Sequence, residues 1–149
     1  SQLHDVGKIH TPRDILRKAG TLDPAETLLM REHTMQGERI IGNAPRLSVA
    51  RKIAGCHHEN WDGSGYPRGL VGEAIPREAR IVKIVDVYEA LRAERPYKKP
   101  YSHEAACQVL VNGDGRTDPH HHFDPELLSL FRSIHGEFQR THAEIRAWT

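Results

Sequence analysis

The chain has 149 residues, of which 38% are hydrophobic and 28% charged, and its formal net charge is +1. This length suits one domain with one core, and the small net charge excludes the broad basic surface of a protein that binds duplex nucleic acid. No apolar run approaches the length of a membrane span, no leader peptide is visible, and two cysteines are too few for a disulfide framework, so we expect a cytoplasmic protein.

Apolar residues recur mostly at helical spacing, with proline and glycine clusters between the segments, which predicts an all-α domain. Asp23-Pro24-Ala25-Glu26 is a strong helix start, because the aspartate can accept from free N–H groups and the glutamate completes a capping box. The β-branched run 81–85 is also compatible with a strand, but a proline in the first turn favours a helix. The expected helical segments are 3–9, 14–18, 23–42, 47–58, 76–92, 102–110 and a last one that opens at Asp124-Pro125 and carries an apolar stripe of Leu127, Leu128, Phe131, Ile134, Phe138, Ile145 and Trp148.

Three histidines continue the apolar lines of these helices. His33 lies in the middle of the apolar face of 23–42, and His57 and His58 extend two neighbouring lines of 47–58. A histidine in such a stripe is either a core residue with satisfied hydrogen bonds or a metal ligand. Adjacent residues on a helix point about 100° apart, so His57 and His58 can each offer a ring nitrogen to a different metal ion.

The glycine-rich segment 59–75 reads as a long ordered loop, and a loop of this length inside a compact domain is more often functional than idle. It contains Gly65-Tyr66-Pro67. Glycine and proline together imply a tight turn whose backbone comes close to another group.

Two charged features allow both a structural and a functional interpretation. Asp86 stands among valines and an alanine, where a carboxylate is costly unless a cation or metal meets it; the alternative is an exposed position on an end turn. Arg95 and Lys98 belong to a basic, proline-rich turn, which is either solvated surface or a clamp for phosphate.

Several residues whose roles are ambiguous individually are consistent with one metal site when they are considered together. The clusters are about 24 to 28 residues apart, the length of a helix and its return, so neighbouring helices can bring them to one centre. Imidazole and carboxylate without thiolate suit Fe or Mn, and also Zn, Ni or Co. More ligands than one tetrahedral ion needs imply at least two ions, bridged by a carboxylate such as Asp5, and two ions suit hydrolysis of a phosphoester. The candidate ligands are His4, Asp5, His33, His57, His58 and Asp86.

Lys8 lies one turn beyond Asp5, and together with Arg95 and Lys98 it can neutralise phosphate oxygens at such a centre.

Three motifs resemble an HD-GYP domain, a branch of the HD superfamily of metal-dependent phosphohydrolases. The resemblance covers nearly the whole chain, to His122-Phe123-Asp124-Pro125, and the motif set is very specific. The motifs are Leu3-His4-Asp5-Val6-Gly7-Lys8-Ile9, His57-His58-Glu59-Asn60-Trp61-Asp62-Gly63-Ser64-Gly65-Tyr66-Pro67, and Asp86-Val87-Tyr88-Glu89-Ala90-Leu91 followed by Arg95-Pro96-Tyr97-Lys98.

This resemblance implies a helical bundle with an ordered Gly-Tyr-Pro loop and a bacterial phosphodiesterase that uses two or three divalent metal ions to hydrolyse cyclic di-GMP to pGpG, GMP or both. It assigns the six candidate ligands to metal positions, Asp5 and Lys8 to catalysis, and Lys8, Gly65, Tyr66, Pro67, Arg95 and Lys98 to substrate binding.

The chain departs from the HD-GYP pattern in three places. An upstream histidine of that family is absent, so we expect residues 1–149 to be a single domain that lacks its N-terminal helices. Glu89 stands where many members have aspartate, and Asp118-Pro119-His120-His121 lengthens a loop. The run His120 to His122 suggests a flexible tract that could bind adventitious metal.

Three functional interpretations follow from the sequence. The first is the cyclic di-GMP phosphodiesterase. The second is an inactive module that binds nucleotide or recruits a signalling protein through the Gly-Tyr-Pro loop. The third is a phosphohydrolase acting on another nucleotide, which the paired histidines and the Gly-Tyr-Pro element disfavour. All three interpretations are compatible with a monomer or a homodimer.

Overall fold

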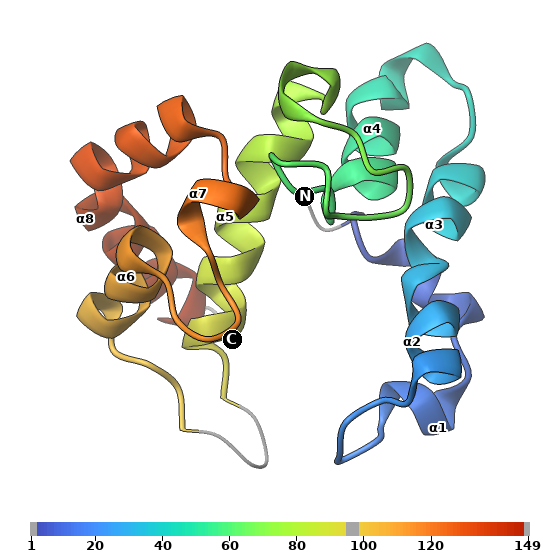
Figure 1. The fold of residues 1–149 in the computed structure, drawn as a ribbon, viewed down its shortest axis with the longest axis horizontal. Coiled ribbons are helices and arrows are strands. Elements are labelled where there is room, and N and C mark those ends of the chain that lie inside the picture. The colour runs from blue at the N-terminus through green and yellow to red at the C-terminus, as the bar shows by residue number, and fades with distance from the viewer. Residues whose placement is uncertain (1–2, 95–98, 148–149) are drawn as a thin grey trace. The chain divides into compact units, whose positions relative to one another are not determined.

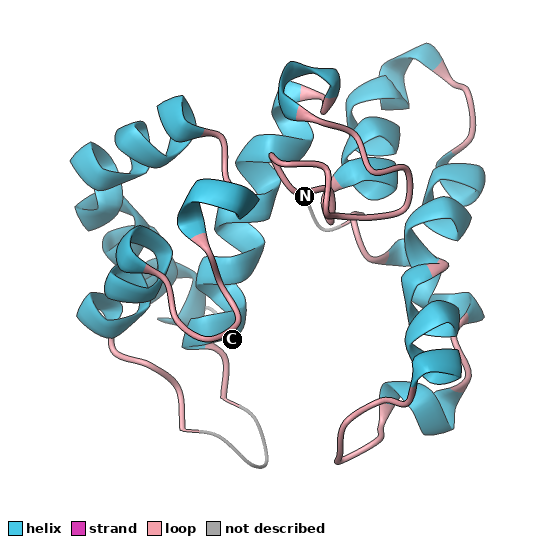
Figure 2. Cartoon of the chain, viewed as in Figure 1, coloured by secondary structure: helices cyan, strands magenta, loops and turns pink. Residues whose placement is uncertain are grey.

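The computed structural model describes residues 3–94 and 99–147, which are mainly helical (Figures 1 and 2). The prediction of an all-α fold is confirmed. Within the described residues the only extended pairing is an isolated bridge between Asp62 and Val71. The elements are η1 (Val6–His10), α1 (Arg13–Leu16), α2 (Pro24–Arg31), α3 (His33–Ile41), η2 (Pro45–Leu47), α4 (Ser48–Cys56), η3 (Gly72–Ala74), α5 (Arg77–Arg92), α6 (His103–Asn112), α7 (Pro119–His122) and α8 (Pro125–Ala147), where η marks a 3-10 helix.

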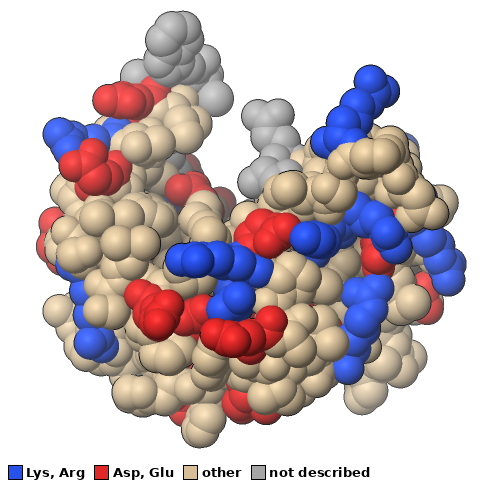
Figure 3. All heavy atoms as spheres, turned by 90° about the horizontal axis from the view of Figure 1, so that it is seen from above, with Lys and Arg blue, Asp and Glu red and all other residues tan. Residues whose placement is uncertain are grey.

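The chain forms two compact units, Ser1–Lys83 and Ile84–Thr149, and the boundary falls inside α5. Among the described residues, none of the helices has both the length and the apolar character that a membrane crossing requires. Acidic and basic side chains lie next to one another on the face shown in Figure 3, in keeping with the small net charge.

In the first unit, η1 and α4 both pack against α3. The predicted capping box at the start of α2 is confirmed, because Asp23 accepts from Glu26 N at 2.9 Å and Glu26 accepts from Asp23 N at 2.8 Å. The prediction of one continuous helix over 23–42 is wrong, since a turn at Glu32 separates α2 from α3. The side chains of His33 and Thr34 donate to the carbonyls of Met30 and Arg31, and such bonds compete with the backbone ladder.

The second unit is built around Tyr88 of α5, which is completely buried. Side chains of α6 and α8 surround it, and Phe131 and Phe138 of α8 contact its ring edge-on or at a tilt. The buried core of this unit consists of Ile84, Tyr88, Ala106, Leu110, Phe123, Leu127, Leu128 and Phe131.

The apolar stripe predicted for the last helix is only partly the buried face. Ile134 and Ile145 are exposed, by 38% and 60%, whereas His142 is buried. With 3.6 residues per turn, the inward line of α8 runs from the buried Phe131 through the partly buried Phe138 to the buried His142, at spacings of seven and four, and leaves the isoleucines outside. Trp148 lies outside the described residues.

Candidate metal centre

Close backbone packing brings the His4-Asp5 pair to the start of α3. The pair directly precedes η1, and Gly7 within η1 is buried against α3. A Cβ atom built on Gly7 would overlap the carbonyl oxygen of His33 and lie 2.5 Å from the backbone nitrogen of Gly37. Only glycine permits this approach, because both obstacles are backbone atoms that cannot turn away.

Backbone carbonyls fix the orientation of two histidine rings. Nδ1 of His33 lies 2.6 Å from Met30 O, and Nδ1 of His57 lies 3.1 Å from both Ile53 O and Ala54 O. A carbonyl only accepts, so we assign the ring proton of each neutral histidine to Nδ1. The two Nε2 atoms, which are 3.4 Å apart, then both carry lone pairs. Two facing lone pairs repel unless a cation lies between them.

Asp5 adds negative charge at the same place. Its Oδ1 atom is buried without a hydrogen-bond partner and lies 3.4 Å from His33 Nε2 and 3.8 Å from His57 Nε2. Its Oδ2 atom accepts from Lys8 Nζ at 2.6 Å and lies 3.4 Å from His4 Nε2. Burial raises the pKa of the Asp5 carboxyl, but the neighbouring His4 ring and the Lys8 ammonium group act against burial, and the pKa lies well below its usual range. Asp5 is therefore an anion with an unsatisfied oxygen.

These groups fit a divalent cation. One ligand atom from each of Asp5, His33, His57 and His58 lies within 4.8 Å of the others, and the His4 ring lies 5.0 Å from that of His57. Burial lowers the pKa of His33 and so favours the neutral ring that a metal requires. A cation would satisfy both the orphaned oxygen of Asp5 and the facing nitrogens, and neutral imidazole with carboxylate is a donor set for Mn, Fe or Zn.

The other predicted site residues lie in other parts of the chain. Asp86 lies on α5 in the part assigned to the second unit, so its role as a ligand stays a prediction. Arg95 and Lys98 lie outside the described residues. Glu89 lies 3.7 Å from Nε2 of His142. The run from His120 to His122 forms α7, capped by Asp118, rather than a flexible tract.

The Gly-Tyr-Pro loop lies against the histidine cluster. The Tyr66 ring stacks on His58, with centroids 4.7 Å apart and an interplanar angle of 16°, and the Arg31 guanidinium lies 4.7 Å from the centre of the same ring. The Tyr66-Pro67 peptide bond is cis. A Cβ built on Gly65 would lie 2.6 Å from Glu59 Cα. The turn therefore folds back on the residue that follows the paired histidines.

Glu59 holds this loop together, and sequence reasoning missed it. Its side chain is buried, with 1% exposed, and its two oxygens accept from the backbone nitrogens of Arg68 at 2.8 Å and Leu70 at 3.0 Å. Arg68 in turn donates to Gly55 O at 3.2 Å and pairs with Glu38. The available signal was an acidic residue directly after two candidate ligands and before a glycine-rich loop.

We expect Glu59→Gln to destabilise the protein by about 1–3 kcal/mol, because an amide has one acceptor oxygen and would turn an NH2 group toward the second backbone donor. Urea unfolding would measure the loss. Glu73→Gln, at an exposed position of the same loop, is the matched control and should unfold like the wild type; equal midpoints for both variants would contradict the anchoring role.

The fold and the cluster together define a helical domain with a candidate metal centre of histidine and carboxylate side chains. A family model described as an HD domain matches residues 1–127. The chain belongs to this family, which confirms the superfamily predicted from the sequence motifs.

Curated relatives match most of this chain, but the chain spans only a part of each. A cyclic di-GMP phosphodiesterase of Vibrio cholerae is 42% identical over 143 residues, covering 91% of this chain and 28% of the relative. A 3'3'-cGAMP-specific phosphodiesterase 2 of the same organism is 44% identical over 140 residues, which cover 93% of this chain and 26% of the relative. A cyclic di-GMP phosphodiesterase of Thermotoga maritima is 41% identical over 137 residues, which cover 91% of this chain and 36% of the relative. These names agree with the resemblance to HD-GYP domains.

Proposed function

We propose that the protein is a metal-dependent phosphodiesterase that hydrolyses cyclic di-GMP to pGpG, GMP or both, in the bacterial cytoplasm. The observation that carries this proposal is the pair of Nε2 atoms of His33 and His57, 3.4 Å apart, beside the orphaned Oδ1 atom of Asp5. An arrangement of three acceptors without a proton between them is costly unless cations are bound. The names of the relatives support the choice of a cyclic dinucleotide as substrate.

Two or three divalent ions are held, in this proposal, by the side chains of His4, Asp5, His33, His57, His58 and Asp86. We favour Fe or Mn, with Zn, Ni or Co as alternatives. When bound, such ions supply Lewis-acid activation of a phosphoester.

The side chains around the ions position the substrate. Lys8 donates to Asp5 at 2.6 Å and is partly exposed, so its ammonium group can approach a phosphate oxygen from the solvent side while it keeps Asp5 ionised. Arg95 and Lys98 add positive charge for the second phosphate of a cyclic dinucleotide. Gly65, Tyr66 and Pro67 border the site, where the stacked pair of Tyr66 and His58 presents an aromatic surface.

A second candidate substrate is 3'3'-cGAMP, because a relative specific for it is 44% identical to this chain. The two dinucleotides share the ring of two phosphates and differ in one base. The groups that approach phosphate therefore serve both, and base selection lies elsewhere.

The test is hydrolysis of both dinucleotides by protein that is first freed of metal with a chelator and then loaded anaerobically with Fe²⁺ or Mn²⁺. We expect turnover of cyclic di-GMP only after loading, with pGpG or GMP as product by chromatography. Turnover of 3'3'-cGAMP alone would change the substrate but keep the reaction. Full metal loading without turnover of either would favour a module that binds nucleotide or a signalling protein.

We expect Lys8→Gln to lower kcat/KM by about 10-fold to 100-fold while metal content is retained, because an unpaired phosphate charge weakens transition-state stabilisation. Lys18→Gln removes another lysine paired with a carboxylate, that of Glu26, and should have wild-type kinetics. Lys8→Gln with unchanged kcat/KM would remove Lys8 from substrate binding.

A further inference from the structure

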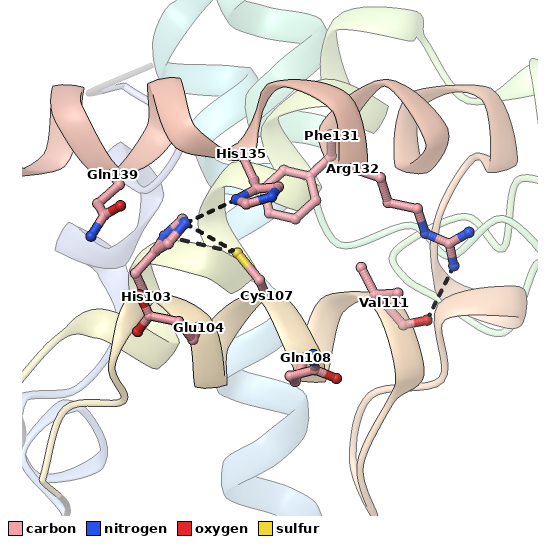
Figure 4. Close-up of a pocket in the computed structure, with 9 residues that line it drawn as sticks. All are labelled: His103, Glu104, Cys107, Gln108, Val111, Phe131, Arg132, His135 and Gln139. Atoms are coloured by element: carbon pink, nitrogen blue, oxygen red, sulfur yellow. Dashed lines mark hydrogen bonds between the residues drawn. The ribbon is translucent and has the colours of Figure 1, made fainter.

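A second cluster of metal-binding side chains lies between α6 and α8 (Figure 4). It borders a pocket of about 390 Å³. Three side chains there, those of His103, Cys107 and His135, offer ligand atoms within 4.8 Å of one another. None of the three has a part in the hydrolase function proposed above.

We propose that His103, Cys107 and His135 bind one borderline-soft divalent cation of the zinc type. Two imidazoles and one thiolate form a donor set that Zn²⁺ favours and that Mg²⁺ and Ca²⁺ do not. The three protein ligands leave a fourth position open to water on the side of the pocket.

Two of the three distances between ligand atoms are close to the edges of a tetrahedral site, and the third is below 4.8 Å. With metal bonds of ~2.0–2.1 Å to nitrogen and ~2.3 Å to sulfur, tetrahedral angles place two nitrogens about 3.3 Å apart and a nitrogen and a sulfur about 3.6 Å apart. Nε2 of His103 lies 3.0 Å from Nδ1 of His135 and 3.6 Å from Sγ of Cys107. These two edges therefore fit an ion after an adjustment of at most about 0.3 Å.

Helix α6 and the side chain of Tyr88 fix the positions of two of the ligands. His103 and Cys107 are four residues apart on α6 and therefore share one face of that helix. Nδ1 of His103 lies 2.9 Å from the hydroxyl oxygen of Tyr88, which is completely buried. When the phenol oxygen accepts from Nδ1–H, Nε2 is left with a lone pair toward Cys107 and His135, as in metal sites where a second partner fixes the ligand histidine.

The cluster is also open to solvent. His103 is 5% exposed, Cys107 is partly exposed and His135 is exposed. An ion can thus enter from the pocket, and its binding would tie α6 to α8 across a sequence separation of 32 residues. The competing explanation is a set of hydrogen bonds among the three side chains without any metal.

Cobalt separates these explanations, because a thiolate bound to Co²⁺ gives an intense near-ultraviolet charge-transfer absorption that nitrogen and oxygen ligands do not give. We would titrate the metal-free, reduced protein with Co²⁺. We expect this absorption to reach a plateau whose intensity corresponds to one thiolate-bound Co²⁺ per chain, and to disappear when Zn²⁺ displaces the cobalt. The centre at Asp5 has no cysteine among its ligands, so it does not contribute.

Three variants locate the site. Cys107→Ser should abolish the absorption, and His135→Gln, at an exposed position, should weaken cobalt binding by at least about tenfold. Cys56→Ser is the matched control; Cys56 is buried in the first unit, 3.6 Å from Arg68 Nη1, and its loss should leave the absorption unchanged. Circular dichroism would check that each variant is folded.

The proposal is overturned if saturating Co²⁺ gives no thiolate absorption, if the absorption survives in Cys107→Ser, or if Cys56→Ser removes it. Should Cys107→Ser not fold, unchanged cobalt affinity in His135→Gln overturns it as well. All of these readouts are independent of phosphodiesterase activity.

Discussion

His57→Ala should lose metal and lower turnover of a cyclic dinucleotide by more than about 100-fold, because removal of groups that only support metal ligands already costs about 10-fold to 100-fold. His57 is the ring whose Nδ1 is held by two backbone carbonyls and whose Nε2 faces both His33 and Asp5. Its loss removes a donor from the middle of the cluster. Metal analysis by mass spectrometry and a hydrolysis assay, both on the same preparation, would measure the two effects together.

His10→Ala is the matched control for this variant. His10 is exposed at the end of η1, so the same change in residue type should leave metal content and turnover at wild-type values. Because His57 is completely buried and its removal also leaves a cavity, circular dichroism must show a folded variant. Normal metal content and turnover in folded His57→Ala protein would exclude the centre at Asp5.

Gly7→Ala should destabilise the first unit by about 3 kcal/mol or more, at or beyond the upper end of the usual cost of overpacking. The new methyl group would overlap the carbonyl oxygen of His33 and approach the backbone nitrogen of Gly37. Since these are backbone atoms of α3, relief requires η1 to move away. That movement would also withdraw Asp5 from His33, so we expect weaker metal binding in addition to a lower urea midpoint.

Gly20→Ala provides the comparison, because a Cβ at Gly20 meets no atom within 4 Å and its φ is not positive. Its free energy of unfolding should stay within about 0.5 kcal/mol of the wild-type value or rise slightly. If Gly7→Ala and Gly20→Ala unfolded at the same urea concentration, the close contact of η1 with α3 would not exist in solution.

The sequence predicts the helical class and several helix starts, because caps and apolar periodicity are local signals. Asp23 and Glu26 illustrate this, since the whole capping box lies within four residues. The turn at Glu32 could not be predicted, because it depends on side chains of His33 and Thr34 that bond backwards to carbonyls. Helical propensity does not report that competition.

The candidate metal centre, too, could be predicted from the sequence only in part. Residue type and motif resemblance selected Asp5, His33, His57 and His58, and the structure places their ligand atoms together; their role as ligands stays a prediction. The acceptor role of Glu59 depends on a loop that returns nine and eleven residues later. His135 lies 32 residues from His103, and nothing in the sequence between them pairs the two.

If the facing Nε2 atoms of His33 and His57 hold a cation as proposed, the lifetime of the folded chain depends on the supply of metal. A cation that binds the folded state alone stabilises it by mass action, by about 2.7 kcal/mol when its free concentration is 100 times the dissociation constant. Metal starvation would then lower the amount of folded protein as well as empty its metal centre, since a larger unfolded fraction is exposed to proteases. The abundance of the protein would in this way follow the metal status of its surroundings.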